Sequence, residues 1–352
     1  MDDLGFLGNS SVNYTVPLLQ EDPLLLRILY FGPTSYVITA IYLCIVGVIG
    51  TLSNGVIMYL YFKDKSLRSP MNLLFVNLAM SDFTVAFFGA MFQFGLTCTR
   101  KYMSPGMALC DFYGFITFIG GLASEMNLFI ISVERYLAVV RPFDVGNLTN
   151  RRVIAGGVFV WLYSLVFAGG PLVGWSSYRP EGLGTWCSIS WQDRSMNTMS
   201  YVTAVFLGCY FFPVSIIIFC YFNVWRKVKG AADAQGGAGT AGKAEKSIFR
   251  MSVIMVTCYL TAWTPYAIVC LIASYGPPNG LPIYAEVLPS LFAKSSQVYN
   301  PIIYVLMNKP YRSALVSLVC RGRNPFDEAG GTAGGTTAKD ETLGKGNKVA
   351  AA

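Results

Sequence analysis

Seven long apolar runs, separated by short polar loops, set the strongest limit on how this chain can fold. They occupy approximately residues 36–61, 71–97, 107–139, 153–173, 200–227, 245–274 and 284–307. Each run is long enough to cross the ~30 Å hydrocarbon core of a bilayer as a helix. With 54% hydrophobic and 13% charged residues in a chain of 352, two ordinary soluble domains are excluded. The sequence predicts an all-α membrane protein, a bundle of seven transmembrane helices.

Basic residues concentrate in the loops after the first, third and fifth runs, among them Lys63, Arg141 and Lys227. By the positive-inside rule these loops are cytoplasmic. We therefore expect a multi-pass plasma-membrane protein with an extracellular N-terminus and, after seven spans, a cytoplasmic C-terminus. We therefore attribute the formal net charge of +7 to the orientation of the chain in the lipid bilayer. We expect membrane lipid as a partner and no nucleic acid.

The predicted organisation has three parts. They are an extracellular N-terminal segment (1–35), the seven-helix bundle with a short amphipathic eighth helix (36–320), and a disordered cytoplasmic tail (321–352). The first part carries N-glycosylation sequons at Asn9 and Asn13. The tail is rich in Gly, Ala and Thr and cannot build a core. Cys320, at the end of the amphipathic segment, is a candidate palmitoylation site.

The sequence has no histidine, which excludes His-dependent catalytic triads and the usual zinc sites. We expect neither an enzyme nor a metal protein. Cys110 begins the third run and Cys187 follows the fourth, so both belong at the extracellular end, where oxidation is permitted. We predict a disulfide between them, with Cys98 as an alternative partner near the same surface. The Cys110 link would hold the loop around Glu181 across the mouth of the bundle.

Lys294 stands in the middle of the seventh run, roughly 15 Å from its outer end at ~1.5 Å of rise per residue. A charged amine at such depth costs at least ~2.5–3.5 kcal/mol, so it indicates a functional site and needs a partner. The alternative is a structural lysine held in a salt bridge inside the bundle.

Two motifs in the seventh run carry a family resemblance. Lys294 lies in FAKSS, and six residues later Asn300 and Pro301 begin NPIIY, which ends at Tyr304. Together they resemble the seventh helix of an opsin, a retinal-binding member of the rhodopsin-like G-protein-coupled receptors. The likeness covers nearly everything between Tyr36 and Cys320, and LRSPMN, GWSSYRPEG and NKPYR look most like ciliary, encephalopsin-type non-visual opsins.

The resemblance implies that 11-cis-retinal is bound covalently to Lys294 as a protonated Schiff base in the dark. Light would isomerise it and so activate a heterotrimeric G protein of the inhibitory or transducin type. An aromatic stripe on the sixth run and glycines on the third suit a flat polyene. The expected retinal pocket comprises Tyr113, Gly114, Thr117, Gly121, Cys209, Tyr210, Tyr259, Trp263, Tyr266 and Ser290.

A buried protonated imine needs a carboxylate nearby. Vertebrate visual pigments have a glutamate three residues after the disulfide cysteine, but this chain has Tyr113 there. It resembles opsins in which the loop glutamate serves, so we assign Glu181 as counterion, which suggests a bistable pigment. Glu125 and Glu286 are the competing acids. We expect Glu125 to be protonated and hydrogen-bonded, and Glu286 to lie near the surface.

The receptor resemblance also implies an activation switch. Arg135 would pair with Glu134 and Glu245 in the dark and release them when the sixth helix moves, and Asn54, Asp82 and Asn300 would share a water-mediated network. The residues assigned to the switch and the G-protein contact are Glu134, Arg135, Tyr136, Tyr221, Glu245, Asn300, Pro301 and Tyr304. Arrestin and a receptor kinase are further possible partners.

Two other functions stay open at this point. One is a peropsin-like retinal photoisomerase, although the ERY, NPIIY and NKPYR motifs favour a signalling receptor. The other is a receptor for a diffusible ligand, in which Lys294 would be a salt-bridge partner.

Overall fold

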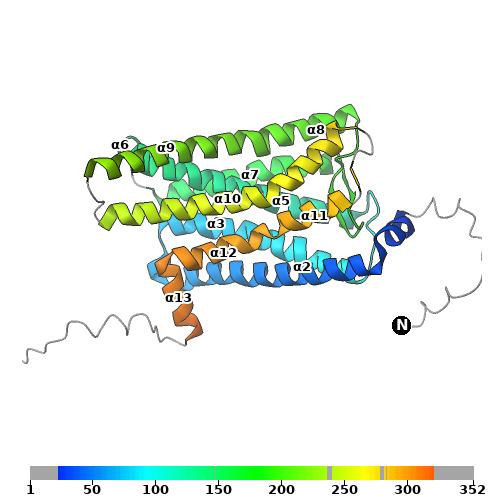
Figure 1. The fold of residues 1–352 in the computed structure, drawn as a ribbon, viewed down its shortest axis with the longest axis horizontal. Coiled ribbons are helices and arrows are strands. Elements are labelled where there is room, and N and C mark those ends of the chain that lie inside the picture. The colour runs from blue at the N-terminus through cyan, green and yellow to red at the C-terminus, as the bar shows by residue number, and fades with distance from the viewer. Residues whose placement is uncertain (1–22, 147, 236–239, 278–280, 283, 321–352) are drawn as a thin grey trace, which may run out of the picture.

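The computed structural model describes residues 23–146, 148–235, 240–277, 281–282 and 284–320. The sequons at Asn9 and Asn13 and the tail from residue 321 lie outside these residues. Figure 1 shows long helices side by side along one axis, with α13 turned aside at one end and a small hairpin at the other. The helices are α2 (Pro23–Lys63), α3 (Pro70–Thr84), α4 (Phe92–Cys98), α5 (Ala108–Val140), α6 (Pro142–Val145), α7 (Asn150–Gly169), α8 (Met196–Phe206), α9 (Phe212–Gln235), α10 (Thr240–Tyr275), α11 (Tyr284–Lys294), α12 (Ser296–Met307) and α13 (Lys309–Val319).

All seven apolar runs are helical, so the predicted fold class is confirmed. Among the described residues, six helical segments are long and apolar enough to cross a membrane. The seventh run is divided at Ser295 into α11 and α12. The first helix, α2, begins at Pro23, well before the expected start at residue 36. It is broken at Gly32, directly before Pro33, where the backbone φ of 67° is not helical.

Two wide turns interrupt the helices that border the interior. The π-helical segments η3 (Val85–Met91) and η5 (Leu207–Phe211) join α3 to α4 and α8 to α9. Such segments free backbone groups and often lie at functional sites. The carbonyl of Gly89, in η3, accepts a hydrogen bond from the hydroxyl of Tyr113 on α5 at 2.9 Å.

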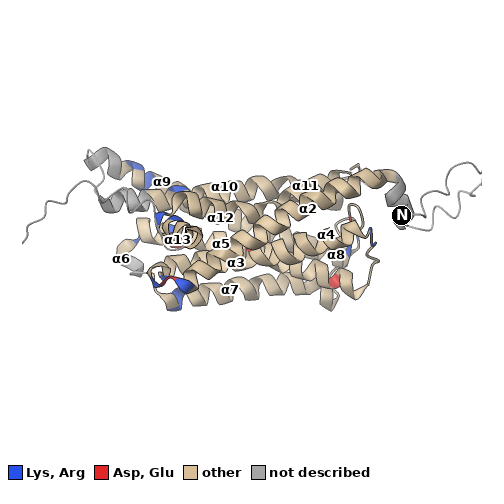
Figure 2. Ribbon diagram, turned by 90° about the horizontal axis from the view of Figure 1, so that it is seen from below, with Lys and Arg blue, Asp and Glu red and all other residues tan. Residues whose placement is uncertain are grey.

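Three further short helical segments lie outside the long helices. They are η2 (Lys65–Leu67) after α2, η4 (Gly170–Val173) after α7, and the predicted amphipathic eighth helix, α13. Asn308 caps α13, since its side chain accepts from the backbone N–H of Tyr311 at 3.4 Å. Lys and Arg gather mostly at the end of the bundle that carries α6 and α13 (Figure 2).

The opposite end of the bundle is covered by an antiparallel hairpin. Strand β1 (Tyr178–Glu181) pairs with β2 (Trp186–Ile189), and Glu181 lies opposite Trp186 in the register. The predicted disulfide between Cys110 and Cys187 is present, and Cys98 is a free, exposed thiol. The disulfide fastens β2 to the start of α5 and so fixes the hairpin as a lid over the interior.

Candidate functional site

A cavity beneath the hairpin brings the predicted pocket residues together. It lies between α5, the α8–η5 segment, α10, α11 and the two strands. Its lining includes the ten residues expected from the sequence: Tyr113, Gly114, Thr117, Gly121, Cys209, Tyr210, Tyr259, Trp263, Tyr266 and Ser290. Lys294, Glu181 and Glu125 also line it. Because most of the walls are apolar or aromatic, the cavity suits an elongated hydrophobic ligand.

Lys294 is the last residue of α11, at the point where the seventh helix is interrupted. Its Nζ lies 5.3 Å from the ring centroid of Trp186, which is within the range of a cation–π contact. Trp186 was not predicted from the sequence. The signal was available, since Trp186 directly precedes the disulfide cysteine that draws β2 over the cavity.

Glu181 reaches the cavity from β1 and is 7% exposed. Its Oε1 accepts a hydrogen bond from the Tyr266 hydroxyl at 2.8 Å, and its Oε2 accepts one from Trp186 Nε1 at 3.0 Å. Burial raises the pKa of Glu181, while the charge of Lys294 and these two hydrogen bonds act in the opposite direction. Trp186 thus contacts both the amine and the carboxylate.

Tyr113 occupies the position of the missing segment-three glutamate. It is buried, and its hydroxyl is directed at Gly89 O and at Gln93 Oε1, which lies 2.8 Å away. This side chain brings no charge to the lysine, so the acidic group of the upper cavity comes from the hairpin.

Close packing between α5 and the lid explains one glycine. A Cβ at Gly114 would lie 2.3 Å from Cδ1 of Tyr178, a distance that real contacts do not reach. The Tyr178 hydroxyl donates to Ala168 O at 2.7 Å, which holds its ring in place. Gly114 therefore lets β1 lie directly against α5.

The lower wall of the cavity is aromatic and joined to neighbouring helices. Trp263 stacks with Tyr259 at 5.7 Å between ring centroids. Its Nε1 donates to Ser296 Oγ on α12 at 3.0 Å. A Cβ at Gly121 would lie 3.2 Å from Trp263 Cη2, so the indole also lies against α5.

The two competing acids occupy different places. Glu286, on α11, is half-buried and accepts from the backbone N–H of Gly182 at 3.4 Å and from the side chain of Gln192. It lines a second cavity on the outer side of the hairpin, which Glu181 also reaches. Glu125 is 7% exposed, and its Oε1 has no hydrogen-bond partner among the described residues. The predicted hydrogen bonding is therefore not found at this oxygen, and an unpaired buried polar group costs about 1–3 kcal/mol.

Below the cavity, Asp82 connects three helices. Its Oδ1 accepts from Ser124 Oγ at 2.7 Å, and its Oδ2 accepts from Asn300 Nδ2 at 2.8 Å. Asn54 Nδ2 donates to Gln297 O at 2.9 Å. The structure thus brings together the three residues of the predicted network, although Asn54 meets the backbone of α12.

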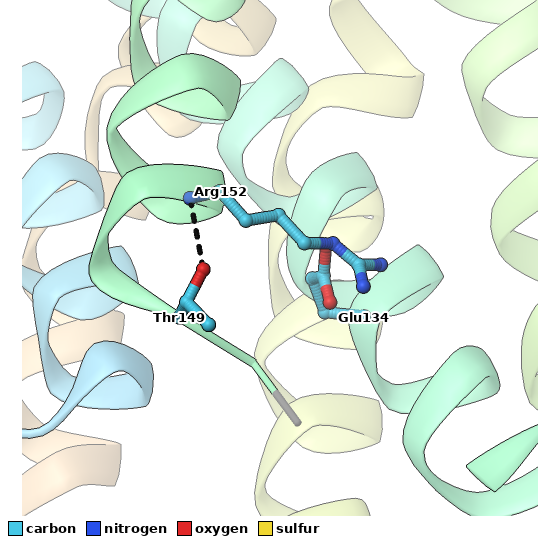
Figure 3. A network of polar contacts seen from close by, with 3 residues as sticks. All are labelled: Glu134, Thr149 and Arg152. Atoms are coloured by element: carbon cyan, nitrogen blue, oxygen red, sulfur yellow. Dashed lines mark hydrogen bonds and ion pairs between the residues drawn. The ribbon is translucent and has the colours of Figure 1, made fainter. Parts of the chain in front are cut away.

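Near the basic end of the bundle, Glu134 forms an ion pair with Arg152 on α7. Arg152 Nε lies 2.9 Å from Glu134 Oε1 (Figure 3). The backbone N–H of Arg152 donates to Thr149 Oγ1 at 3.3 Å, which caps α7. This partner of Glu134 was not predicted from the sequence, and the side chain of Glu245 lies outside what the structure describes.

The other predicted switch residues lie in the same half of the bundle. Tyr136 packs against Phe219 with ring centroids 5.7 Å apart. Tyr304 packs against Phe75 at 4.8 Å and follows Pro301, which lies inside α12. The Tyr304 hydroxyl is buried without a hydrogen-bond partner within the described residues, and Tyr221 packs against Phe249 with ring centroids 5.9 Å apart.

Comparison with known proteins extends over most of the chain. Residues 53–304 match the family described as 7 transmembrane receptor (rhodopsin family). The chain is 36% identical over 290 residues to pinopsin from Columba livia, covering 82% of this chain and 83% of pinopsin. It is 32% identical over 353 residues to rhodopsin from Leucoraja erinaceus, covering 98% of this chain and 99% of that rhodopsin.

A solved structure agrees with these matches. The crystal structure of squid rhodopsin superposes with a TM-score of 0.76 at 34% identity, covering 82% of this chain and 86% of the squid chain. The family match, the sequence identities and the shared fold lead to one assignment. This chain belongs to the rhodopsin family of seven-transmembrane receptors, and within it to the opsins, the G-protein-coupled photoreceptors.

Proposed function

We propose that this protein is a light-activated receptor that carries 11-cis-retinal on Lys294 and activates a heterotrimeric G protein of the inhibitory or transducin type. The observation that carries the proposal is the pair of Lys294 and Glu181 in one apolar cavity. An amine that can condense with an aldehyde, releasing water, faces a cavity with flat aromatic walls. A carboxylate lies in the same cavity and can balance the positive charge that results.

Retinal, when bound, supplies light absorption and a change of shape. The residues of this chain supply the rest of the mechanism. Lys294 holds one end of the ligand through its Nζ. Glu181, with hydrogen bonds from Tyr266 and Trp186, retains a negative charge near that nitrogen and so helps to keep a proton on it.

The same contacts suggest how the signal travels. Trp263 lies at the floor of the cavity and donates a hydrogen bond to Ser296, four residues before Asn300. Asn300 is bonded to Asp82, and the Glu134–Arg152 pair follows at the basic end of the bundle. A displacement of Trp263 would reach these groups through packed side chains, and they would rearrange when the sixth helix moves to admit a G protein.

A single spectroscopic experiment tests the proposal. The full-length protein is incubated in the dark with 11-cis-retinal, and its absorption spectrum is recorded before and after illumination. We expect a visible band, and borohydride should fix the chromophore to wild type but not to K294A. K309A serves as a control, because Lys309 lies on α13, at the end of the bundle opposite the hairpin and the cavity beneath it. Covalent chromophore in K294A would refute the assignment of the lysine.

Light-dependent nucleotide exchange on the G protein then separates signalling from photoisomerase activity. We expect exchange to rise on illumination. A pigment that only converts all-trans-retinal to the cis form, without exchange, would favour the photoisomerase. We also propose a bistable pigment, in which the band returns on illumination with a second wavelength and the chromophore stays bound.

We further propose a plasma-membrane location with the N-terminal segment, residues 1–35, outside and the tail, residues 321–352, inside. The basic end of the bundle in Figure 2 supports this orientation by the positive-inside rule. Glycosylation at Asn9 and Asn13, which glycosidase treatment would reveal, would test it. Cys320 is exposed and follows α13, which supports palmitoylation there, and arrestin and a receptor kinase are proposed partners of the active state.

A further inference from the structure

Glu125 is the one acid of the cavity to which the proposed mechanism gives no task. It lies one helical turn beyond Gly121 on α5 and lines the cavity at 7% exposure. Its Oε1 finds no hydrogen-bond partner within the part of the chain that the structure describes. A buried carboxyl oxygen that borders a cavity without a partner indicates that a polar group of a ligand belongs there.

The neighbouring polar side chains do not donate a hydrogen bond to this oxygen, because the tyrosine hydroxyls among them donate to backbone carbonyls. The charge of Glu125 acts on Tyr163 and Tyr259, and Tyr259 lines the same cavity. The Tyr163 hydroxyl donates to Gly208 O at 3.0 Å, and the Tyr259 hydroxyl donates to Gly121 O at 3.1 Å. Cys209, also close by, offers only a thiol, which is a weak donor. None of these neighbours is a cation, so a neutral carboxyl is the favoured form.

The position of Glu125 defines which part of a ligand it meets. The lid packs against α5 at Gly114, and the lysine and Glu181 lie beside Trp186 of the lid. At ~1.5 Å of rise per residue, Glu125 lies about 16 Å further along α5 than Gly114. An elongated ligand anchored on Lys294 therefore presents its opposite end to Glu125.

We propose that Glu125 hydrogen-bonds a hydroxyl group on the ring of the chromophore, so that this protein selects ring-hydroxylated retinaldehydes over retinal itself. The inference rests on the proposed function, because it requires a retinoid anchored on Lys294. A hydroxyl can both donate and accept, so it matches a neutral carboxyl whichever oxygen bears the proton. A buried water would need two to four polar partners, whereas a hydroxyl attached to the ligand needs only Glu125.

Competitive uptake tests the inference. Full-length wild type is offered equal amounts of 11-cis-retinal and 11-cis-3-hydroxyretinal or 11-cis-4-hydroxyretinal, and the bound retinoids are extracted and quantified. We expect at least one hydroxylated form to be preferred about tenfold, the equivalent of one buried hydrogen bond. E125L and E125M should lose the preference, while E125Q should keep it, since an amide also bonds a hydroxyl. Uptake of plain retinal by each variant shows that it folds.

S164A is the matched control. Ser164 is buried on α7 outside the cavity lining, and its hydroxyl donates to Val160 O at 2.8 Å, so this variant should keep the wild-type preference. Equal uptake of all three retinoids by wild type, or an unchanged preference in E125L and E125M, would overturn the inference while the proposed function stands. Failure of wild type to bind any retinoid would overturn both.

Discussion

Replacing Tyr266 by phenylalanine removes one hydroxyl from beside Glu181 and leaves the aromatic ring in place. In the native protein this hydroxyl donates to Glu181 Oε1 at 2.8 Å. A hydrogen bond to a charged group contributes ~1.5–3 kcal/mol, which corresponds to at least about tenfold in the proton affinity of the carboxylate. In Y266F the donor left to Glu181 among the described residues is Trp186 Nε1, at 3.0 Å from Oε2.

The sign of the effect follows from the environment of Glu181. Burial raises the pKa of this carboxyl, and the Tyr266 hydrogen bond lowers it, so losing the bond raises it further. The negative charge is present above the pKa and is lost as pH falls through it. The dark pigment of Y266F should therefore undergo its acid-induced spectral change at higher pH than wild type.

An acid titration of the dark absorption band measures this change. Y210F is the matched control, because it also removes a tyrosine hydroxyl from the cavity. That hydroxyl pairs with Thr264 Oγ1 at 2.9 Å and not with Glu181. Coinciding titrations of Y266F and wild type, or an equal displacement in Y210F, would show that the Tyr266 hydrogen bond does not stabilise the charge of Glu181.

Three further predictions follow from other contacts. E181Q should move the dark band into the ultraviolet at neutral pH, since the proton on the Lys294 nitrogen loses its counter-charge; an unchanged spectrum would transfer the role to another acid. G114A should lower the thermal midpoint of the dark pigment, because overpacking against Tyr178 costs ~1–3 kcal/mol. G156A, whose Cβ would meet Ile130 at an ordinary 3.6 Å, should not, and equal midpoints in the two variants would contradict the packing argument. E134Q and R152A should lower this midpoint by similar amounts, and the double variant by less than their sum, because both remove the same ion pair; additive effects would show that the pair contributes no coupling.

The sequence predicted the features of this molecule that follow from the difference between lipid and water. Seven apolar runs have to be helical in a bilayer, and Lys294 at such depth has to face a cavity. Spacing along helices and the resemblance to opsins placed the ten pocket residues, because residues one turn apart share a face. The disulfide followed from two cysteines at one oxidising surface.

What the sequence did not predict depends on contacts between distant segments. The contact of Trp186 with both Lys294 and Glu181 needs the register of the hairpin. The choice of Arg152 as a partner of Glu134 depends on how α5 and α7 pack, and Arg151 is equally basic in the sequence. The unpaired oxygen of Glu125 could not be foreseen either, since it depends on where its neighbours direct their own protons.

The interruption at Ser295 has a mechanical consequence. Its N–H bonds Phe292 O at 3.0 Å, and its carbonyl accepts from Val298 N at 3.1 Å, so the chain tightens into a short three-residue turn directly after Lys294. This interruption separates α11, which carries Lys294, from α12, which carries Asn300 and Tyr304. If a ligand on Lys294 moved, α12 would be free to turn relative to α11, and the movement would be passed on as a rotation toward the basic end of the bundle.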